Sequence, residues 1–211
     1  MESASSKSVT NQPTPDKASN GTVSNSPLRP YTSSSGFTYP AIWSFPPFFT
    51  LQPNPQTFAH QLTLWTRLIL SWAKYHRVFR IDAGAADGGD CREVLENKSI
   101  GRRLLPTSIR QLVSSMEKEG LLSPDPPRQP NTFLIYWRKP EEWGSMIYDW
   151  VIENGMGGSI MTFYEITDGD MAHTTEFHQL PPVLLRRSLE TLVKRGKAQI
   201  VKGEAEGVKF F

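Results

Sequence analysis

The alternation of apolar and polar positions divides the chain into a polar N-terminal zone and two successive units of helix and strand. In residues 55–77, apolar side chains recur every three or four positions, which is the spacing of one helix face. The face carries Leu62, Trp65, Leu68, Ile69 and Trp72. Asn54 is suited to cap this helix and Pro55 to open its first turn, so the pattern predicts a long helix with a defined start.

The rest of the first unit completes a recognisable order of elements. It comprises a strand at 78–82, a loop at 83–90, a short helix at 93–97, a helix bearing Ile109, Leu112, Val113 and Met116 that ends at Gly120, and strands at 121–122 and 132–137 around the proline-rich residues 123–131. The order helix, strand, helix, helix and hairpin is that of a winged helix.

The same order recurs in the second unit. Its expected elements are a helix that opens at Pro140 and bears Trp143, Met146, Ile147, Trp150 and Val151, a strand at 160–166, a helix from Pro181-Pro182 to Gly196 with Leu185, Leu189, Leu192 and Val193 inward, and strands at 198–201 and 207–211. The fold class is therefore α+β with two tandem winged-helix domains: residues 39–138 hold the Pro-aromatic segment plus the first winged helix, and residues 139–211 hold the second. Almost no linker separates them at Arg138-Lys139, which predicts that the two units pack at a fairly fixed angle.

Residues 1–38 differ from the rest in composition, because Ser, Thr, Pro and Asn dominate and large apolar residues are sparse. Such a segment cannot bury enough surface to offset its ordering entropy. We expect a disordered tail here.

The run from Phe45 to Asn54 places prolines and phenylalanines immediately before the first long helix. Proline fixes the backbone and removes amide donors, which favours an extended ribbon with little freedom left to lose on binding. One interpretation is that the aromatic rings dock into a partner. The other is that Phe48, Phe49 and Leu51 cover the core of their own domain, and the residues alone do not decide between the two.

Composition narrows the setting of the protein. The formal net charge is +2, which gives no strong global field. Cys91 is the single cysteine, so an intrachain disulfide is excluded, which fits a reducing cytosol. No stretch approaches the roughly 20 apolar residues of a membrane span, and the N-terminus shows neither a secretory signal nor a myristoylation glycine.

The residues that bear chemistry do not form a catalytic pattern. His173 and His178 lie near Asp168, Asp170 and Glu176, but their spacing matches no metal motif, and we expect no metal or cofactor. Arg92 beside Cys91 could lower the pKa of that thiol, yet no histidine and acid lie at a spacing that would make it a nucleophile. We therefore expect that the protein is not an enzyme.

Four segments together resemble one known family. They are the run from Phe45 to Asn54, the segment from Phe133 to Gly144, the triplet Glu176-Phe177-His178 and the ending from Gly207 to Phe211. In order and spacing they resemble the small ESCRT-II subunits, the vacuolar protein-sorting-associated protein 25 family. The resemblance runs from about Tyr39 to the C-terminus, and the N-terminal extension and residues 83–90 depart from the family's compact form.

The resemblance implies a non-enzymatic adaptor made of two tandem winged helices. Two copies would join one copy each of two larger winged-helix ESCRT-II subunits and dock through Pro-aromatic elements. The residues that match one such element are Pro46, Pro47, Phe48 and Phe49, and Tyr39, Pro40 and Trp43 lie where the family has a second. The second match is looser, because Trp43 replaces the more usual tyrosine. The expected location is cytoplasmic, with recruitment to the endosomal membrane through indirect contact, where ubiquitinated cargo is sorted into multivesicular bodies.

In this family the second winged helix recruits the ESCRT-III subunit that starts filament assembly. Residues expected outside the core stripe of its third helix are Leu184, Arg186, Arg187, Lys194 and Arg195. They could meet an amphipathic partner helix of acidic character, or form an ordinary solvated face.

The alternative function is nucleic-acid binding, since winged helices often place their third helix in the major groove. The third helix of the second unit is basic, whereas that of the first unit balances Arg110 and Lys118 against Glu117 and Glu119. The pI of about 8.7 is below the usual footprint of nucleic-acid-binding domains. We expect no nucleic-acid partner.

Overall fold

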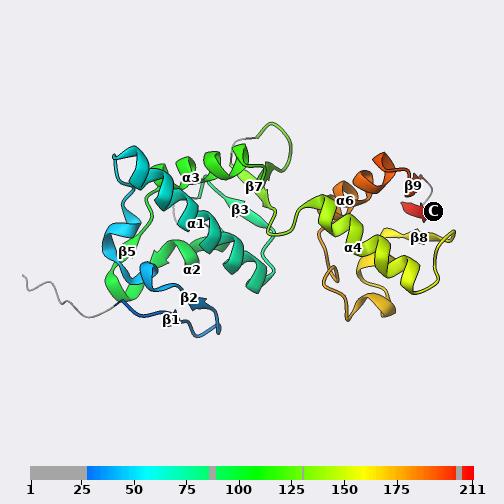
Figure 1. Ribbon diagram of the computed structural model, residues 1–211, viewed down its shortest axis with the longest axis horizontal. Coiled ribbons are helices and arrows are strands. Elements are labelled where there is room, and N and C mark those ends of the chain that lie inside the picture. Colours follow the sequence, from blue (N-terminus) through cyan, green and yellow to red (C-terminus); the bar gives the residue numbers. More distant parts are fainter. Residues whose placement is uncertain (1–27, 86–88, 130, 203–205) are drawn as a thin grey trace, which may run out of the picture.

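The computed structural model describes residues 28–85, 89–129, 131–202 and 206–211. Two α+β units lie side by side along the long axis of the molecule (Figure 1). Residues 1–27 of the expected disordered tail lie outside the described residues. Residues 28–38 contradict that expectation in part, because β1 (Tyr31–Thr32) pairs antiparallel with β2 (Thr38–Tyr39) and Phe37 between them is buried.

The first unit has the expected winged-helix order. Its elements are α1 (Pro55–His76), β3 (Arg80–Asp82), α2 (Arg92–Leu95), α3 (Pro106–Lys118), β6 (Leu122–Pro124) and β7 (Thr132–Ile135). The three strands form an antiparallel sheet in the order β3-β7-β6. The short helix expected at 93–97 is wrong at its end, because Glu96–Asn97 is β4 and pairs with β5 (Arg102–Arg103). Gly101, at a φ of 61°, turns the chain between these two strands.

The second unit repeats this plan. Its elements are α4 (Pro140–Glu153), β8 (Ile160–Thr162), α5 (Phe163–Thr167), α6 (Pro182–Lys194), β9 (Ala198–Val201) and β10 (Gly207–Phe210). The strand order β8-β10-β9 is equivalent to that of the first sheet. Both units are thus winged helices, as the order of the expected elements indicated.

The strand expected at 160–166 is only half correct, because the chain turns into α5 at Phe163. A capping box causes the switch. Thr162 Oγ1 accepts a hydrogen bond from Glu165 N at 3.1 Å, and Glu165 Oε2 accepts one from Thr162 N at 2.6 Å. These bonds satisfy amides at the helix start and lower the pKa of the Glu165 carboxyl.

The described residues form two hydrophobic cores, and the second also takes in Leu134 and Tyr136 from the end of the first unit. The first is built around Trp65, Ile69 and Met116, and the second around Trp143, Ile147 and Leu189, all with 0% exposure. Helices α4 and α6 approach closely at Gly144, where an added Cβ would lie 2.7 Å from Ser188 O. None of the helices in the described part of the chain has the length and apolar character needed to cross a bilayer.

The start of α1 provides a direct test of the local signals. Asn54 Oδ1 accepts hydrogen bonds from the amides of Gln56 at 3.0 Å and Thr57 at 3.2 Å. Replacing Asn54→Ala leaves these amides without a side-chain partner and should lower the free energy of unfolding by about 1 kcal/mol. Urea unfolding followed by circular dichroism measures the loss. Asn54→Asp keeps the acceptor and should unfold like the wild type; equal losses in both variants would contradict the capping role.

Candidate protein-docking sites

The Pro-aromatic run does not extend from the domain as a ribbon. Residues Pro46–Phe49 form a 3-10 turn, and Ala41–Ser44 form another just before it. Phe48 and Phe49 are each only 2% exposed. The prediction of an extended segment with projecting rings is therefore wrong for this chain, and the rings cover their own core.

Helix α1 explains why the run folds back. The ring of Phe48 stacks on Trp65 with centroids 4.3 Å apart, and Phe49 meets the same indole edge-on at 5.3 Å. Trp65 Nε1 donates a hydrogen bond to Phe48 O at 3.1 Å. Gln61 Nε2 donates to Pro47 O and Thr50 O, both at 3.3 Å. Because this helix face supplies both aromatic contact and hydrogen-bond partners, the run needs no second protein to bury its rings.

The turn nevertheless leaves an apolar edge in solvent. Phe45 remains 41% exposed, and Pro46 and Pro47 beside it are also exposed. The buried rings hold this edge in one conformation. Sequence reasoning did not single out Phe45, because the pattern does not show which of three nearby phenylalanines faces outward.

The second Pro-aromatic element is also mostly buried. Tyr39 is 0% and Trp43 is 4% exposed, and their rings stack at 3.9 Å, whereas Pro40 is exposed. Trp43 Nε1 donates to Val94 O at 3.1 Å, and Tyr39 OH donates to Glu93 O at 3.3 Å. Burial raises the pKa of the Tyr39 hydroxyl. Tyr39 and Trp43 therefore pack inside the first unit.

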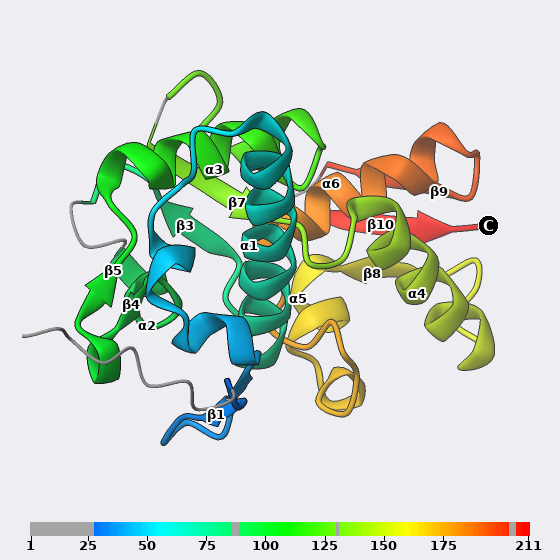
Figure 2. The same cartoon turned by 60° about the vertical axis from the view of Figure 1, so that its left-hand side comes forward.

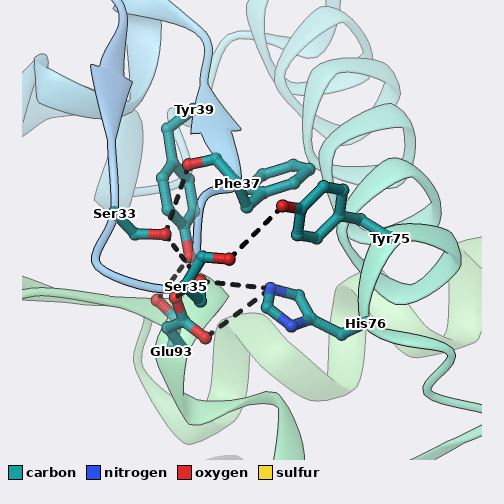
Figure 3. Close-up of polar contacts among 7 residues, drawn as sticks. All are labelled: Ser33, Ser35, Phe37, Tyr39, Tyr75, His76 and Glu93. Atoms are coloured by element: carbon teal, nitrogen blue, oxygen red, sulfur yellow. Dashed lines mark hydrogen bonds and ion pairs between the residues drawn. The ribbon is translucent and has the colours of Figure 1, made fainter.

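A polar cluster fixes the β1–β2 hairpin to the first unit (Figure 3). Ser35 Oγ donates to Glu93 Oε1 at 3.0 Å, and Tyr75 OH donates to Ser35 O at 3.3 Å. His76 Nε2 lies 3.5 Å from Ser35 Oγ and 3.8 Å from Glu93 Oε2. A serine–histidine–acid relay needs the serine and the acid on different ring nitrogens. Here both approach the same nitrogen, so the cluster is a structural tie.

The residues predicted for the partner-facing side of α6 lie in different environments in the structure. Leu184 is 0% exposed, so placing it outside the core was wrong. Helix α4 approaches Ser188 and Leu192 at Gly144, and Leu184, one turn before Ser188, is buried too, so the buried face is wider than the expected stripe. Conversely, Val193 was expected inward and is 39% exposed.

The basic residues of α6 also have different surroundings. Arg187 donates hydrogen bonds to Ser123 Oγ at 2.8 Å and to Tyr136 OH, so it contacts the first unit and does not face outward as expected. Arg186 pairs with Glu206 and lies over the Phe163 ring at 5.6 Å. Lys194 and Arg195 are exposed, and Arg195 Nη1 reaches Ser145 Oγ at 3.1 Å. Lys194 and Arg195 are thus the exposed members of the predicted set, whereas the Arg186 side chain is partly exposed and already paired with Glu206.

Other candidate chemistry finds no support in the geometry. Burial, and then the charge of Asp90, raise the pKa of Cys91 to about 12, so Arg92 does not lower the pKa of this thiol below its usual value. The rings of His173 and His178 lie 4.6 Å apart, and His178 Nδ1 is 2.8 Å from Thr167 O. Within the described ranges, no three residues among His, Cys, Asp and Glu are grouped to hold a metal ion.

Comparison with known proteins places this fold in a family. A family model described as ESCRT-II complex subunit matches residues 42–181. Vacuolar protein-sorting-associated protein 25 of Xenopus laevis is 40% identical over 177 residues, which cover 83% of this chain and 99% of that protein. The Homo sapiens protein of the same name is 38% identical over 176 residues, covering 83% and 98%.

Solved structures agree with the sequence match. The crystal structure of subunit VPS25 of the endosomal trafficking complex ESCRT-II has a TM-score of 0.71 at 27% identity and covers 82% of this chain and 98% of that chain. A chain in the crystal structure of endosomal complex ESCRT-II (VPS22/VPS25/VPS36) has a TM-score of 0.70 at 27% identity, with the same coverage. The chain therefore belongs to the family of ESCRT-II complex subunits, as the motif resemblance predicted.

Burial of Phe48 leads to a stability prediction. Replacing Phe48→Ala removes the ring that stacks on Trp65 and should lower the free energy of unfolding by about 3–5 kcal/mol. Replacing the exposed Phe45→Ala should change it by about 0.5 kcal/mol or less. Urea unfolding of both variants measures the difference. Comparable stability of the Phe48→Ala and Phe45→Ala variants would contradict the folded-back turn.

The raised pKa of Cys91 predicts low thiol reactivity. With a pKa of about 12, about one thiol in 10,000 is ionised at pH 8, and Cys91 is 0% exposed as well. The folded protein should therefore resist a disulfide-exchange reagent that labels it completely in urea. The rate of labelling at pH 8 measures this, and rapid reaction in the folded state would show that the site opens.

Proposed function

We propose that this chain is an adaptor subunit of ESCRT-II that joins the two larger winged-helix subunits to the ESCRT-III subunit that starts filament assembly. Family membership and the match to a solved complex named VPS22/VPS25/VPS36 support the first half. The exposed edge of Phe45, Pro46 and Pro47 is the observation that carries the docking site. The work of the adaptor is endosomal sorting of ubiquitinated cargo into multivesicular bodies.

The docking edge is preorganised. Phe48, Phe49 and Trp65 hold the turn, and Gln61 hydrogen-bonds its carbonyls, so the edge loses little conformational entropy when a partner covers it. In this proposal Pro46 and Pro47 contact the partner together with Phe45. Phe48, Phe49, Tyr39 and Trp43 act from beneath by holding the segment in place, and exposed Pro40 continues the surface.

The second unit presents the ESCRT-III surface. Lys194 and Arg195, exposed at the end of α6, are the residues of the predicted set that can meet an acidic partner helix directly. Leu184 is buried beneath the helix, Arg186 pairs with Glu206, and Arg187 donates a hydrogen bond to Ser123. Two copies of the subunit in one complex would present two such surfaces and raise the effective concentration of the recruited protein. Contact with the endosomal membrane is then indirect.

A surface substitution separates docking from folding. Phe45→Ala removes a ring that is 41% exposed, and a partner can bury only that exposed part, so the loss of about 0.6–1.2 kcal/mol corresponds to about 3- to 8-fold weaker binding. Calorimetric titration of the variant into the complex of the two larger subunits measures the affinity. The control is Phe58→Ala, which truncates another partly exposed phenylalanine on α1. Wild-type affinity for the Phe45→Ala variant would refute the docking edge.

The nucleic-acid alternative is tested with the same protein. An adaptor should bind the larger subunits and show no duplex binding at modest salt. Duplex binding that weakens steeply with salt, without association with the larger subunits, would overturn the proposal.

A further inference from the structure

The two winged helices are connected by more than the polypeptide chain. The junction itself is packed, because Trp137 Nε1 donates to Val78 O at 3.1 Å and the Trp137 ring lies between Phe79, at 5.2 Å, and Trp143, at 5.0 Å. Val78 and Phe79 belong to the first unit, and Trp143 lies near the start of α4 in the second unit. The Trp137 indole therefore packs between side chains of both units.

One set of side chains ties the end of α1 to residues 176–178 of the second unit. Arg77 donates from Nη1 to Glu176 O at 3.1 Å and from Nη2 to His178 O. Glu176 Oε2 accepts a hydrogen bond from Arg138 Nη2 at 2.6 Å, and its Oε1 lies 3.8 Å from Lys74 Nζ. Three basic side chains thus converge on one glutamate residue, two at its carboxylate and one at its carbonyl. The lower end of α1 and the segment after α5 lie side by side in Figure 2.

A second tie joins different elements. Arg187 on α6 donates to Ser123 Oγ at 2.8 Å and to Tyr136 OH, and its Nη2 lies 3.5 Å from Pro124 O. Tyr136 is 9% exposed, so this guanidinium is held against a largely buried tyrosine. The contact joins α6 to the β6–β7 hairpin of the first unit, away from the α1 end.

We infer that Glu176 and Arg187 are positioning residues that fix the angle between the two winged helices. Leu134 and Tyr136 of the first unit are buried in the core of the second, so the junction is already packed. Two further ties between different pairs of elements restrict rotation about this packed junction, because a rotation that preserves one tie separates the atoms of the other. Each surface ion pair is weak and screened by salt, but the arginine forks also grip carbonyl and hydroxyl oxygens, which gives them direction.

The angle between the two units matters because the docking edge lies on the first unit and the proposed ESCRT-III surface lies on the second. A fixed angle would hold the ESCRT-III surface in one direction relative to the docking edge. This functional consequence rests on the proposed function. The fixed angle itself does not, since it is a property of the free chain. The two can therefore be tested apart.

The test is a distance distribution between the units. Spin labels at Ser114→Cys on α3 and Asp149→Cys on α4 occupy exposed positions, and the native Cys91 is buried. Pulsed electron paramagnetic resonance on the full chain should give one narrow distribution. With Glu176→Gln and Arg187→Met combined, we expect the width to increase at least twofold, and each single variant to have a smaller effect. Raising the salt concentration should broaden the Arg187→Met sample more than the wild type.

Matched controls distinguish positioning from a loss of stability. Glu190→Gln and Arg110→Met change the same residue types at exposed sites that form no side-chain ion pair with any residue of the described ranges, and should leave the distribution narrow. Circular dichroism and thermal melting should show both units folded at the temperature of labelling in every variant. A wild-type distribution that is already broad, or a double variant that stays as narrow as the wild type, would overturn the inference.

Measuring binding on the same samples separates the two claims. A broadened double variant that still binds the larger ESCRT-II subunits like the wild type supports both the positioning role and the docking edge. Broadening in a chain whose wild type does not bind those subunits supports the positioning role alone and rejects the proposed function.

Discussion

The stack of Phe48 on Trp65 is the contact on which the first half of the molecule depends. The two rings are nearly parallel, at 5° and 4.3 Å, and the indole N–H closes a hydrogen bond to the backbone of the same phenylalanine. This pairing turns a proline-rich segment, which locally favours an extended chain, into a tight turn. It also decides which surface the segment offers, because with these rings turned inward Phe45 and the two prolines must face solvent.

Burial in the first unit continues from this stack toward the N-terminus. Phe49 lies edge-on to Trp65 and 6.3 Å from Trp43, and Trp43 stacks on Tyr39. The β1–β2 hairpin then adds Phe37 against Tyr75 and ties Ser35 to Glu93. A continuous aromatic row therefore links the hairpin to α1. The aromatic residues of the Pro-aromatic motifs serve here as the inner layer of the domain, while the prolines of these motifs stay exposed.

Local signals predicted the elements well, and long-range partners account for what the sequence could not show. Asn54 and Pro55 marked the start of α1 because capping is a property of a few neighbouring residues. Where Phe48 packs depends on Trp65, seventeen residues later along the chain. Nothing in the sequence around either residue predicts this contact. Leu184 was misplaced because helical period gives the centre of an apolar face but not its width. That width depends on how closely α4 approaches at Gly144. The sequence places Arg187 on the solvent side of α6, because the periodicity of one helix carries no information about contacts with the neighbouring unit.

Arg77 shows how a local backbone cost can serve the whole molecule. It ends α1 with a φ of 54°, in the left-handed region where glycine is the usual residue and a side chain is disfavoured. Stability-directed engineering would choose glycine at this position and gain a relaxed helix end. The same change would delete the guanidinium that holds two carbonyls of the second unit. Selection for a higher melting temperature and selection for a defined shape therefore oppose one another at this single residue.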